Sequence, residues 1–167
     1  ISSNSVNCSQ EDKHGNMWFG TSNGLNKLDA KTGKFEAYFE KNGLPNDFIY
    51  SILPDSKGFL WMSTNKGVSK FNPEQKNENG SAFRNYDVND GLQGLEFNQG
   101  AYYQTQSGEI FLGGVNGFNT FFPDKIKDNP LIIDDIIKDF TSKHGRRVYQ
   151  KEELDIVKVE VKNAKDN

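Results

Sequence analysis

The sequence predicts an all-β protein assembled from repeated four-stranded units. Three observations indicate this class. Aromatic residues make up 13% of the 167 residues, with 13 Phe, and there are 16 Gly; aromatic side chains suit pleated sheets and glycine suits tight turns. Short apolar runs alternate with turn signals made of Gly, Asn and Asp. Most tellingly, one pattern of residues occurs three times along the chain.

The repeated pattern is carried by three segments that align on their glycines. They are EDKHGNMWFGTSNGLNKLD (11–29), PDSKGFLWMSTNKGVSKFNP (54–73) and TQSGEIFLGGVNGFNTFFPD (105–124). The equivalent positions are Gly15, Gly58 and Gly108, then Trp18, Trp61 and Phe111, and then Gly24, Gly67 and Gly117. Successive copies are 43 and 50 residues apart. A period in the forties with short strands is typical of a propeller blade. The sequence therefore predicts a partial β-propeller of about three four-stranded blades, at about 5–40, 47–88 and 97–124.

Within a blade, the turn chemistry and the apolar runs predict each strand in order. In the second copy we expect strands at 49–54, 59–64, 68–71 and 83–86. DKHGN and DSKGF predict hairpin turns between the first two strands, since Asp suits the first position and Gly tolerates a positive φ. SNGL and NKGV predict the next hairpin.

Several residues in these repeats could suggest chemistry, but a structural role fits them better. Trp18 and Trp61 recur at one repeat position, so we interpret them as core between blades rather than as sugar-stacking residues. His14 has Lys57 as its counterpart in the next copy, which indicates an exposed turn residue. DKHGN and DSKGF lack the alternating oxygen ligands of a calcium loop, so their aspartates are interpreted as turn formers.

The repeated pattern ends after residue 124, which predicts a domain boundary. We expect propeller blades over 1–128 and a second, truncated β-sandwich domain that starts in 129–167. KIKDNP is interpreted as a connector. The pattern of LIIDDIIKDF (131–140) allows a strand or a helix, and its β-branched residues favour a strand. LDIVKVEVKN alternates apolar and charged residues and predicts a half-buried strand.

Composition and charge exclude several classes of function. The net charge of −3 does not provide the basic face of a nucleic-acid-binding protein, so no nucleic-acid partner is expected. The sequence has no apolar run of 18 residues, so a membrane is expected only through a longer parent chain. Two distant His and one Cys provide no metal-ligand spacing, and we expect no metal and no cofactor. Without a nucleophile motif or a phosphate-binding glycine loop, the segment is not expected to be an enzyme.

The loops that join successive blades are the predicted binding region. NGLPND (42–47) and NDGLQGLEFNQG (89–100) are rich in amide and carboxylate groups. The candidate ligand-binding residues are Asn46, Asp47, Asn89, Asp90, Gln93, Glu96 and Asn98. Such groups suit hydroxyl-rich ligands through paired hydrogen bonds. The alternative is that they satisfy backbone groups of their own loops.

These repeats resemble the two-component regulator propeller family, in the cores quoted above and in the linking pieces NGLPND and DGLQGLEFNQGA. GEIFLGGVNGFNTFFPDKI is similar to the last blade of such propellers. The residues that follow resemble the start of the triple-tyrosine domain, an immunoglobulin-like sandwich, although no tyrosine triplet is present. The resemblance implies a periplasmic ectodomain of a membrane-bound sensor histidine kinase that responds to glycans or their breakdown products.

Three blades do not close a ring, and this implies exposed aromatic faces and strand edges. We therefore expect a fragment of a longer chain, or copies that self-associate as a dimer. Two other functions stay open: a propeller lyase or glycoside hydrolase fragment, and an interaction propeller without a small ligand.

Overall fold

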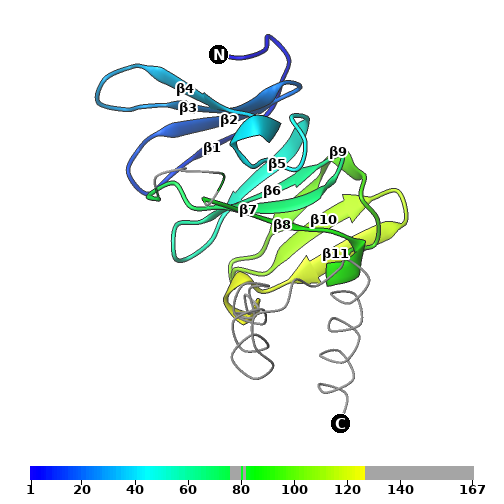
Figure 1. Ribbon diagram of the computed structural model, residues 1–167. Helices are drawn as coiled ribbons and strands as arrows, with labels where there is room; N and C mark the ends of the chain where they lie inside the picture. The colour runs from blue at the N-terminus through cyan, green and yellow to red at the C-terminus, as the bar shows by residue number, and fades with distance from the viewer. Residues whose placement is uncertain (76–79, 81, 127–167) are drawn as a thin grey trace, which may run out of the picture. The chain divides into compact units, whose positions relative to one another are not determined.

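The described part of the protein forms three antiparallel sheets that follow one another along the chain (Figure 1). The structure is a computed structural model that describes residues 1–75, 80 and 82–126. The strands are β1 (Val6–Glu11), β2 (Met17–Thr21), β3 (Gly24–Leu28), β4 (Phe35–Tyr38), β5 (Ile49–Pro54), β6 (Leu60–Thr64), β7 (Gly67–Phe71), β8 (Phe83–Tyr86), β9 (Phe97–Gln104), β10 (Ile110–Gly114) and β11 (Gly117–Phe121). Short 3-10 helices η1 (Glu40–Asn42), η3 (Val88–Asp90) and η4 (Pro123–Lys125) lie in the connections. The predicted all-β class is confirmed.

Each sheet is a meander in which consecutive strands pair, as expected for a propeller blade. The orders are β1-β2-β3-β4, β5-β6-β7-β8 and β9-β10-β11, which we call blades 1, 2 and 3. The strands predicted for the second copy agree with β5 to β8 to within one residue at each end. Blade 3 differs, because its sheet has three strands among the described residues and the expected fourth is not one of them. The domain boundary at 128 and the strands predicted within 129–167 lie outside the described residues.

An aspartate organises the first hairpin of blades 1 and 2, as the turn signals predict. In blade 2, Asp55 Oδ1 accepts the backbone N–H groups of Lys57 and Phe59, at 2.9 and 3.0 Å. Gly58 closes this turn with a φ of +89°, which glycine adopts without steric cost. Asp12 makes the same turn in blade 1, where it accepts from the backbone of His14 and Asn16.

The other carboxylate oxygen of each aspartate binds the tryptophan of the same blade. Trp18 Nε1 donates to Asp12 Oδ2 at 2.8 Å, and Trp61 Nε1 donates to Asp55 Oδ2 at 3.0 Å. Partial burial opposes ionisation of Asp12, but the indole, amide and backbone donors outweigh it and lower its pKa. Blade 3 has Thr105 and Phe111 at these two positions. The phenyl ring has no N–H group, so this turn needs no carboxylate.

Both tryptophans are buried between neighbouring blades, as predicted. Trp18 is fully buried and packs edge-on against Phe71 of blade 2, with ring centroids 5.4 Å apart. Trp61 stacks on Tyr86 at 5.5 Å and contacts Phe121 of blade 3 at 4.9 Å. Because a buried indole removes roughly 150–250 Å2 from water, these two side chains dominate the joints between blades.

Candidate ligand-binding face

The first strands of the three blades lie side by side, since β5 contacts both β1 and β9. Each of these strands has an irregular register near its start: between Val6 and Cys8, between Ile49 and Ser51, and opposite Leu112 and Gly114. Bulges of this kind redirect side chains and often lie beside functional sites. The residues that have no partner in the strand register at these irregularities are Asn7 in β1, Tyr50 in β5 and 98–101 in β9.

The loops that lead into these strands lie against the hairpins of the preceding blade. Gly24, in the β2–β3 hairpin, donates its backbone N–H to the carbonyl of Asp47 at 2.6 Å. In the same way Gly67, in the β6–β7 hairpin, donates to Leu95 at 2.7 Å. These bonds bring the predicted loops and hairpins to one end of the blades. We call this end the crossover face and define it by residues 42–50, 89–98, 22–23, 65–66 and 115–116.

In the first loop, the predicted residues Asn46 and Asp47 are held by local hydrogen bonds. Asn46 donates to Glu40 Oε1 at 3.0 Å and accepts the backbone N–H of Phe48 at 3.0 Å. Asp47 Oδ1 accepts the backbone N–H of Glu40 at 2.6 Å. Both side chains are half-buried and shape the loop. Lys66 lies 3.8 Å from Glu40 and adds a positive charge at the rim.

In the second loop, two of the predicted residues are also used for loop structure. Asp90 Oδ2 accepts the backbone N–H of Asp87 at 2.9 Å, which closes the turn around η3. Gln93 Oε1 accepts the backbone N–H of Asn116 at 2.7 Å, and its amide nitrogen donates to the Glu96 carbonyl at 3.3 Å. Asn89 is exposed on η3, where its backbone N–H donates to Asp87.

Glu96 and Asn98 are the predicted residues that present exposed side chains next to a first strand. Neither makes a side-chain hydrogen bond to another residue of the described part of the chain. Asn98 lies in the bulge of β9, as Asn7 and Tyr50 lie in the irregular parts of β1 and β5. The polar groups of these two side chains, Glu96 and Asn98, are therefore not used for the structure of the described loops.

Sequence reasoning missed an aromatic pair on the same face. The rings of Phe48 and Tyr50 lie 4.8 Å apart, and the Tyr50 hydroxyl donates to Asn65 Oδ1 at 2.6 Å. Burial, followed by the charge of Glu96, raises the pKa of Tyr50 above its ordinary value. The signal was present, because Tyr50 occupies the repeat position that holds Asn7 in the first copy. Half-buried rings beside amides and a carboxylate can contact both the apolar face and the hydroxyls of a small polar ligand.

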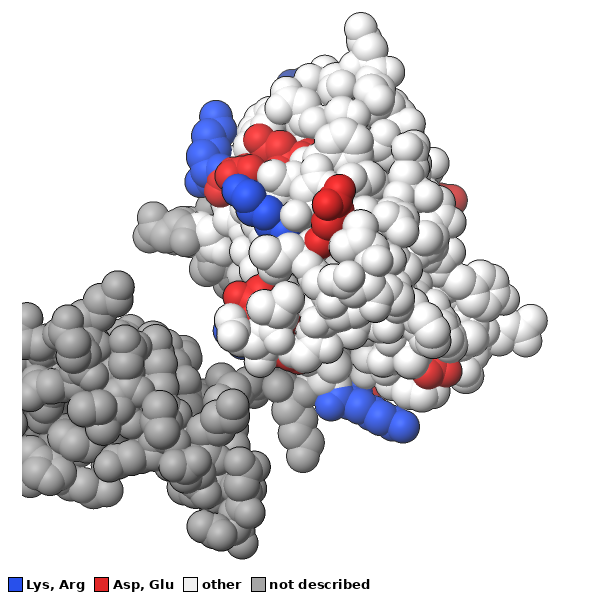
Figure 2. Space-filling view, turned by 90° about the vertical axis from the view of Figure 1, so that its right-hand side faces the viewer, with Lys and Arg blue, Asp and Glu red and all other residues white. Residues whose placement is uncertain are grey.

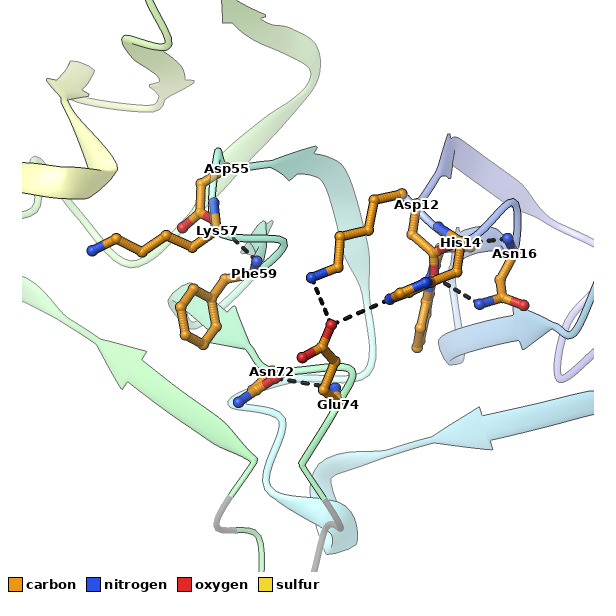
Figure 3. Close-up of polar contacts among 10 residues, drawn as sticks. Asp12, His14, Asn16, Asp55, Lys57, Phe59, Asn72 and Glu74 are labelled. Carbon is orange, nitrogen blue, oxygen red and sulfur yellow. Dashed lines mark hydrogen bonds and ion pairs between the residues drawn. The ribbon is translucent and has the colours of Figure 1, made fainter.

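The opposite end of the blades holds a charged contact between blades 1 and 2. Figure 3 shows His14, in the turn before β2, and Glu74, in the loop after β7, directed toward each other. Glu74 Oε1 lies 2.6 Å from Lys13 Nζ and 3.2 Å from His14 Nε2. The hydrogen bonds from Lys13 and then His14 hold the pKa of Glu74 below its usual range. All three side chains are about half exposed, so this contact joins two blades and forms no enclosed site.

Two further observations concern the described residues alone. Within them, no three His, Cys, Asp or Glu side chains are grouped so as to hold a metal ion. None of the helices in this part of the chain has the length and apolarity needed to cross a bilayer.

Comparison with known proteins relates these blades to bacterial sensors. Residues 1–23 and 43–66 match the family described as two component regulator propeller. Histidine kinase P4 of Formosa agariphila is 32% identical over 105 residues, which are 63% of this chain and 7% of that protein. The extracellular domain assigned to the hybrid two component system BT3049 of B. thetaiotaomicron is 32% identical, with a TM-score of 0.66, over 73% of this chain and 16% of that one.

A second solved ectodomain agrees in fold. The extracellular domain assigned to BT4673 of B. thetaiotaomicron has a TM-score of 0.62 at 24% identity and covers 81% of this chain. The chain spans only 7% to 20% of the length of these relatives. Its relatives thus include a histidine kinase and an extracellular domain assigned to a hybrid two component system, and two of its segments match the two component regulator propeller family.

Proposed function

We propose that this chain is part of the extracellular, periplasmic ectodomain of a two-component sensor histidine kinase, in which it senses a ligand and transmits the signal. The observation that carries this proposal is the 32% identity, at a TM-score of 0.66, to the extracellular domain assigned to BT3049. The blades supply binding and positioning, and the catalytic kinase domain belongs to the parent chain.

The ligand we propose is a glycan or one of its breakdown products, bound at the crossover face. Exposed Glu96 and Asn98 offer a carboxylate and an amide, which bind pairs of hydroxyl groups. The neighbouring Phe48 and Tyr50 rings offer the apolar surface on which a sugar ring stacks. These groups support a neutral, hydroxyl-rich ligand.

For the signal, we propose that residues 129–167 begin the immunoglobulin-like triple-tyrosine domain. Ligand binding would favour one of two arrangements of this domain and its counterpart in a second copy of the sensor. A ligand shifts such an equilibrium only by its difference in affinity for the two arrangements. The proposal therefore requires a ligand contact that differs between them.

The test combines binding with signalling. The chain is titrated with a panel of neutral and acidic oligosaccharides while its thermal unfolding is followed. A ligand at 100 times its dissociation constant stabilises the fold by about 2.7 kcal/mol. The double variant Glu96→Ala, Asn98→Ala is expected to lose this stabilisation. Gln106→Ala is the control, since Gln106 is an exposed amide in the β9–β10 turn.

The same variants, placed in the kinase that carries this segment, test the signalling role through a transcriptional reporter. We expect the Glu96, Asn98 double variant to lose its response to the stabilising oligosaccharide and the Gln106 variant to keep it. If no oligosaccharide stabilises the chain, the glycan assignment is wrong. If the reporter ignores deletion of blades 1 to 3, the sensor role itself is wrong.

A further inference from the structure

Blade 3 has a cavity beside its last described strand, between blades 2 and 3. The cavity has a volume of about 210 Å3. Blade 2 contributes Trp61, Val68 and Tyr86 to its wall, and β11 contributes Phe121. Most of the lining is therefore aromatic or aliphatic, and the cavity opens next to the edge of β11.

The equivalent place between blades 1 and 2 is filled by a strand. There β8 pairs with β7, and Phe83 lies opposite Phe71 in the register. The Phe83 ring stacks on Phe71 with centroids 4.4 Å apart and meets Tyr38 of blade 1 at 6.0 Å. In the repeat, Phe121 corresponds to Phe71 and Tyr86 corresponds to Tyr38. The cavity thus occupies the position in blade 3 that Phe83 occupies in blade 2.

The space around two pairs of equivalent glycines also distinguishes the filled place from the cavity. A Cβ atom added to Gly43 would lie 3.1 Å from the Phe83 ring, whereas one added to its counterpart Gly91 would meet no atom of the described residues within 4 Å. A Cβ atom on Gly67 would collide with the carbonyl oxygen of Tyr86, the last residue of β8. One added to the counterpart Gly117 would also meet no atom of the described residues within 4 Å. In the described part of the chain, blade 3 therefore has room at both ends of a fourth strand.

We propose that the β11 edge and this cavity bind an extended peptide segment that carries two aromatic residues three positions apart. The first aromatic side chain enters the cavity between Phe121 and Tyr86 and lies over Gly91. The segment pairs with β11 along its length, and the carbonyl of its fourth residue lies against Gly117. This is strand addition, in which backbone hydrogen bonds provide affinity and a side-chain pocket provides specificity.

The segment comes from a polypeptide outside residues 1–167, because every pair of aromatic residues three positions apart in this sequence already lies in a strand of the three blades. Aromatic residues three apart occur here at Phe35/Tyr38, Phe83/Tyr86 and Phe118/Phe121. The first pair lies in β4, the second in β8 and the third in β11 itself. Beyond residue 126 the aromatics are Phe140 and Tyr149, which are too far apart.

The experiment uses the whole chain and a labelled peptide with the sequence of residues 82–91, AFRNYDVNDG, which contains the β8 pair. We expect saturable binding by fluorescence anisotropy. A peptide with the F83A substitution is expected to bind at least about tenfold more weakly, because a buried Phe side chain is lost. Equal affinity of the two peptides, or no binding of either, would overturn the proposal.

Protein variants show where the peptide binds. Ile126 lines the cavity and is half-buried, so Ile126→Trp is expected to fill the cavity and to weaken binding at least about tenfold. Lys125→Trp adds the same side chain at an exposed position outside the cavity and is expected to leave binding unchanged. Binding that survives Ile126→Trp would mean that the peptide displaces β8 from blade 2 or binds elsewhere, and would refute the site.

Discussion

We predict that the Asp55 carboxylate stabilises the fold because it accepts a hydrogen bond from the Trp61 indole, and replacement of Asp55 by threonine tests this. Threonine at 55 reproduces the turn of blade 3, where Thr105 Oγ1 accepts the backbone N–H of Glu109 at 3.0 Å. What it cannot reproduce is the bond of 3.0 Å to the Trp61 indole. Trp61 is 2% exposed, so its N–H group would lose its partner in a nearly dry site. An unpaired buried donor costs about 1–3 kcal/mol, and we expect Asp55→Thr to lower the free energy of unfolding by about 2 kcal/mol.

The decisive measurement is a double-mutant cycle. Trp61→Phe removes the donor and part of the ring, and should cost about 2 kcal/mol through poorer packing. In the double variant Asp55→Thr, Trp61→Phe no indole is left unpaired. Its loss should therefore be about 2 kcal/mol smaller than the sum of the single losses. Urea unfolding followed by far-UV circular dichroism gives the four free energies, without reliance on the fluorescence of the mutated residue.

A matched control separates the indole bond from the turn. Asp29 also accepts two backbone N–H groups, from Lys31 and Thr32, but it binds no indole. The pair Asp29→Thr, Trp61→Phe should be additive to within about 0.5 kcal/mol. Additivity of the Asp55 cycle as well would refute the reasoning, since the carboxylate would then act on the turn alone.

Two further outcomes follow from the open side of blade 3. In urea unfolding, Gly67→Ala should lower the free energy of unfolding by about 2 kcal/mol more than Gly117→Ala does. Both glycines have a positive φ, but only Gly67 faces the carbonyl of Tyr86. Equal losses of free energy would contradict this difference in the space around the two glycines. Phe118 is 64% exposed, whereas its counterpart Val68 is buried by the next blade. We therefore expect the chain to dimerise with concentration in sedimentation velocity and Phe118→Ser to shift it toward monomer, and a wild-type monomer at every concentration would count against this.

Charged side chains are sparse over much of the face in Figure 2, the side of the molecule on which the β10–β11 hairpin lies in Figure 1. Tyr103 and Val115 are exposed in blade 3, as Phe118 is. Large apolar side chains that are exposed in one blade are candidates for an interaction site.

The sequence could predict the blades because each blade repeats its own local chemistry. The aspartate, the glycine and the tryptophan of the first hairpin lie within seven residues, and every one of these positions recurs. The contact of Glu74 with His14 could not be predicted in this way, because it joins residues 60 apart on different blades. The expected fourth strand of blade 3 was drawn from the period alone. It stays a prediction, because the residues that follow Ile126 lie outside the described part of the chain.

The predicted binding residues divide according to whether their side chains bond to the backbone of their own loop. Short loops have backbone N–H groups to satisfy, and nearby Asn and Asp side chains do this at little cost in entropy. Asn46, Asp47 and Asp90 serve their own loops in this way. Glu96 and Asn98 do not, because Glu96 directly precedes β9, Asn98 lies in its bulge, and strand pairing holds Phe97 between them. Sequence reasoning could not separate residues that serve their own loops from residues whose polar groups stay exposed.

The two ends of each blade are thus under different physical constraints. At the end with the first hairpins, an aspartate, a turn and a buried tryptophan depend on one another, so a change at one position costs free energy at the others. At the crossover face, the bulged residues lie outside the ladder of strand pairing, and their side chains can change without loss of a ladder hydrogen bond. Asn7, Tyr50 and the residues around Asn98 already differ in this way within one chain. A propeller built from such blades can therefore change side chains at the crossover face while the buried tryptophans that join its blades stay the same.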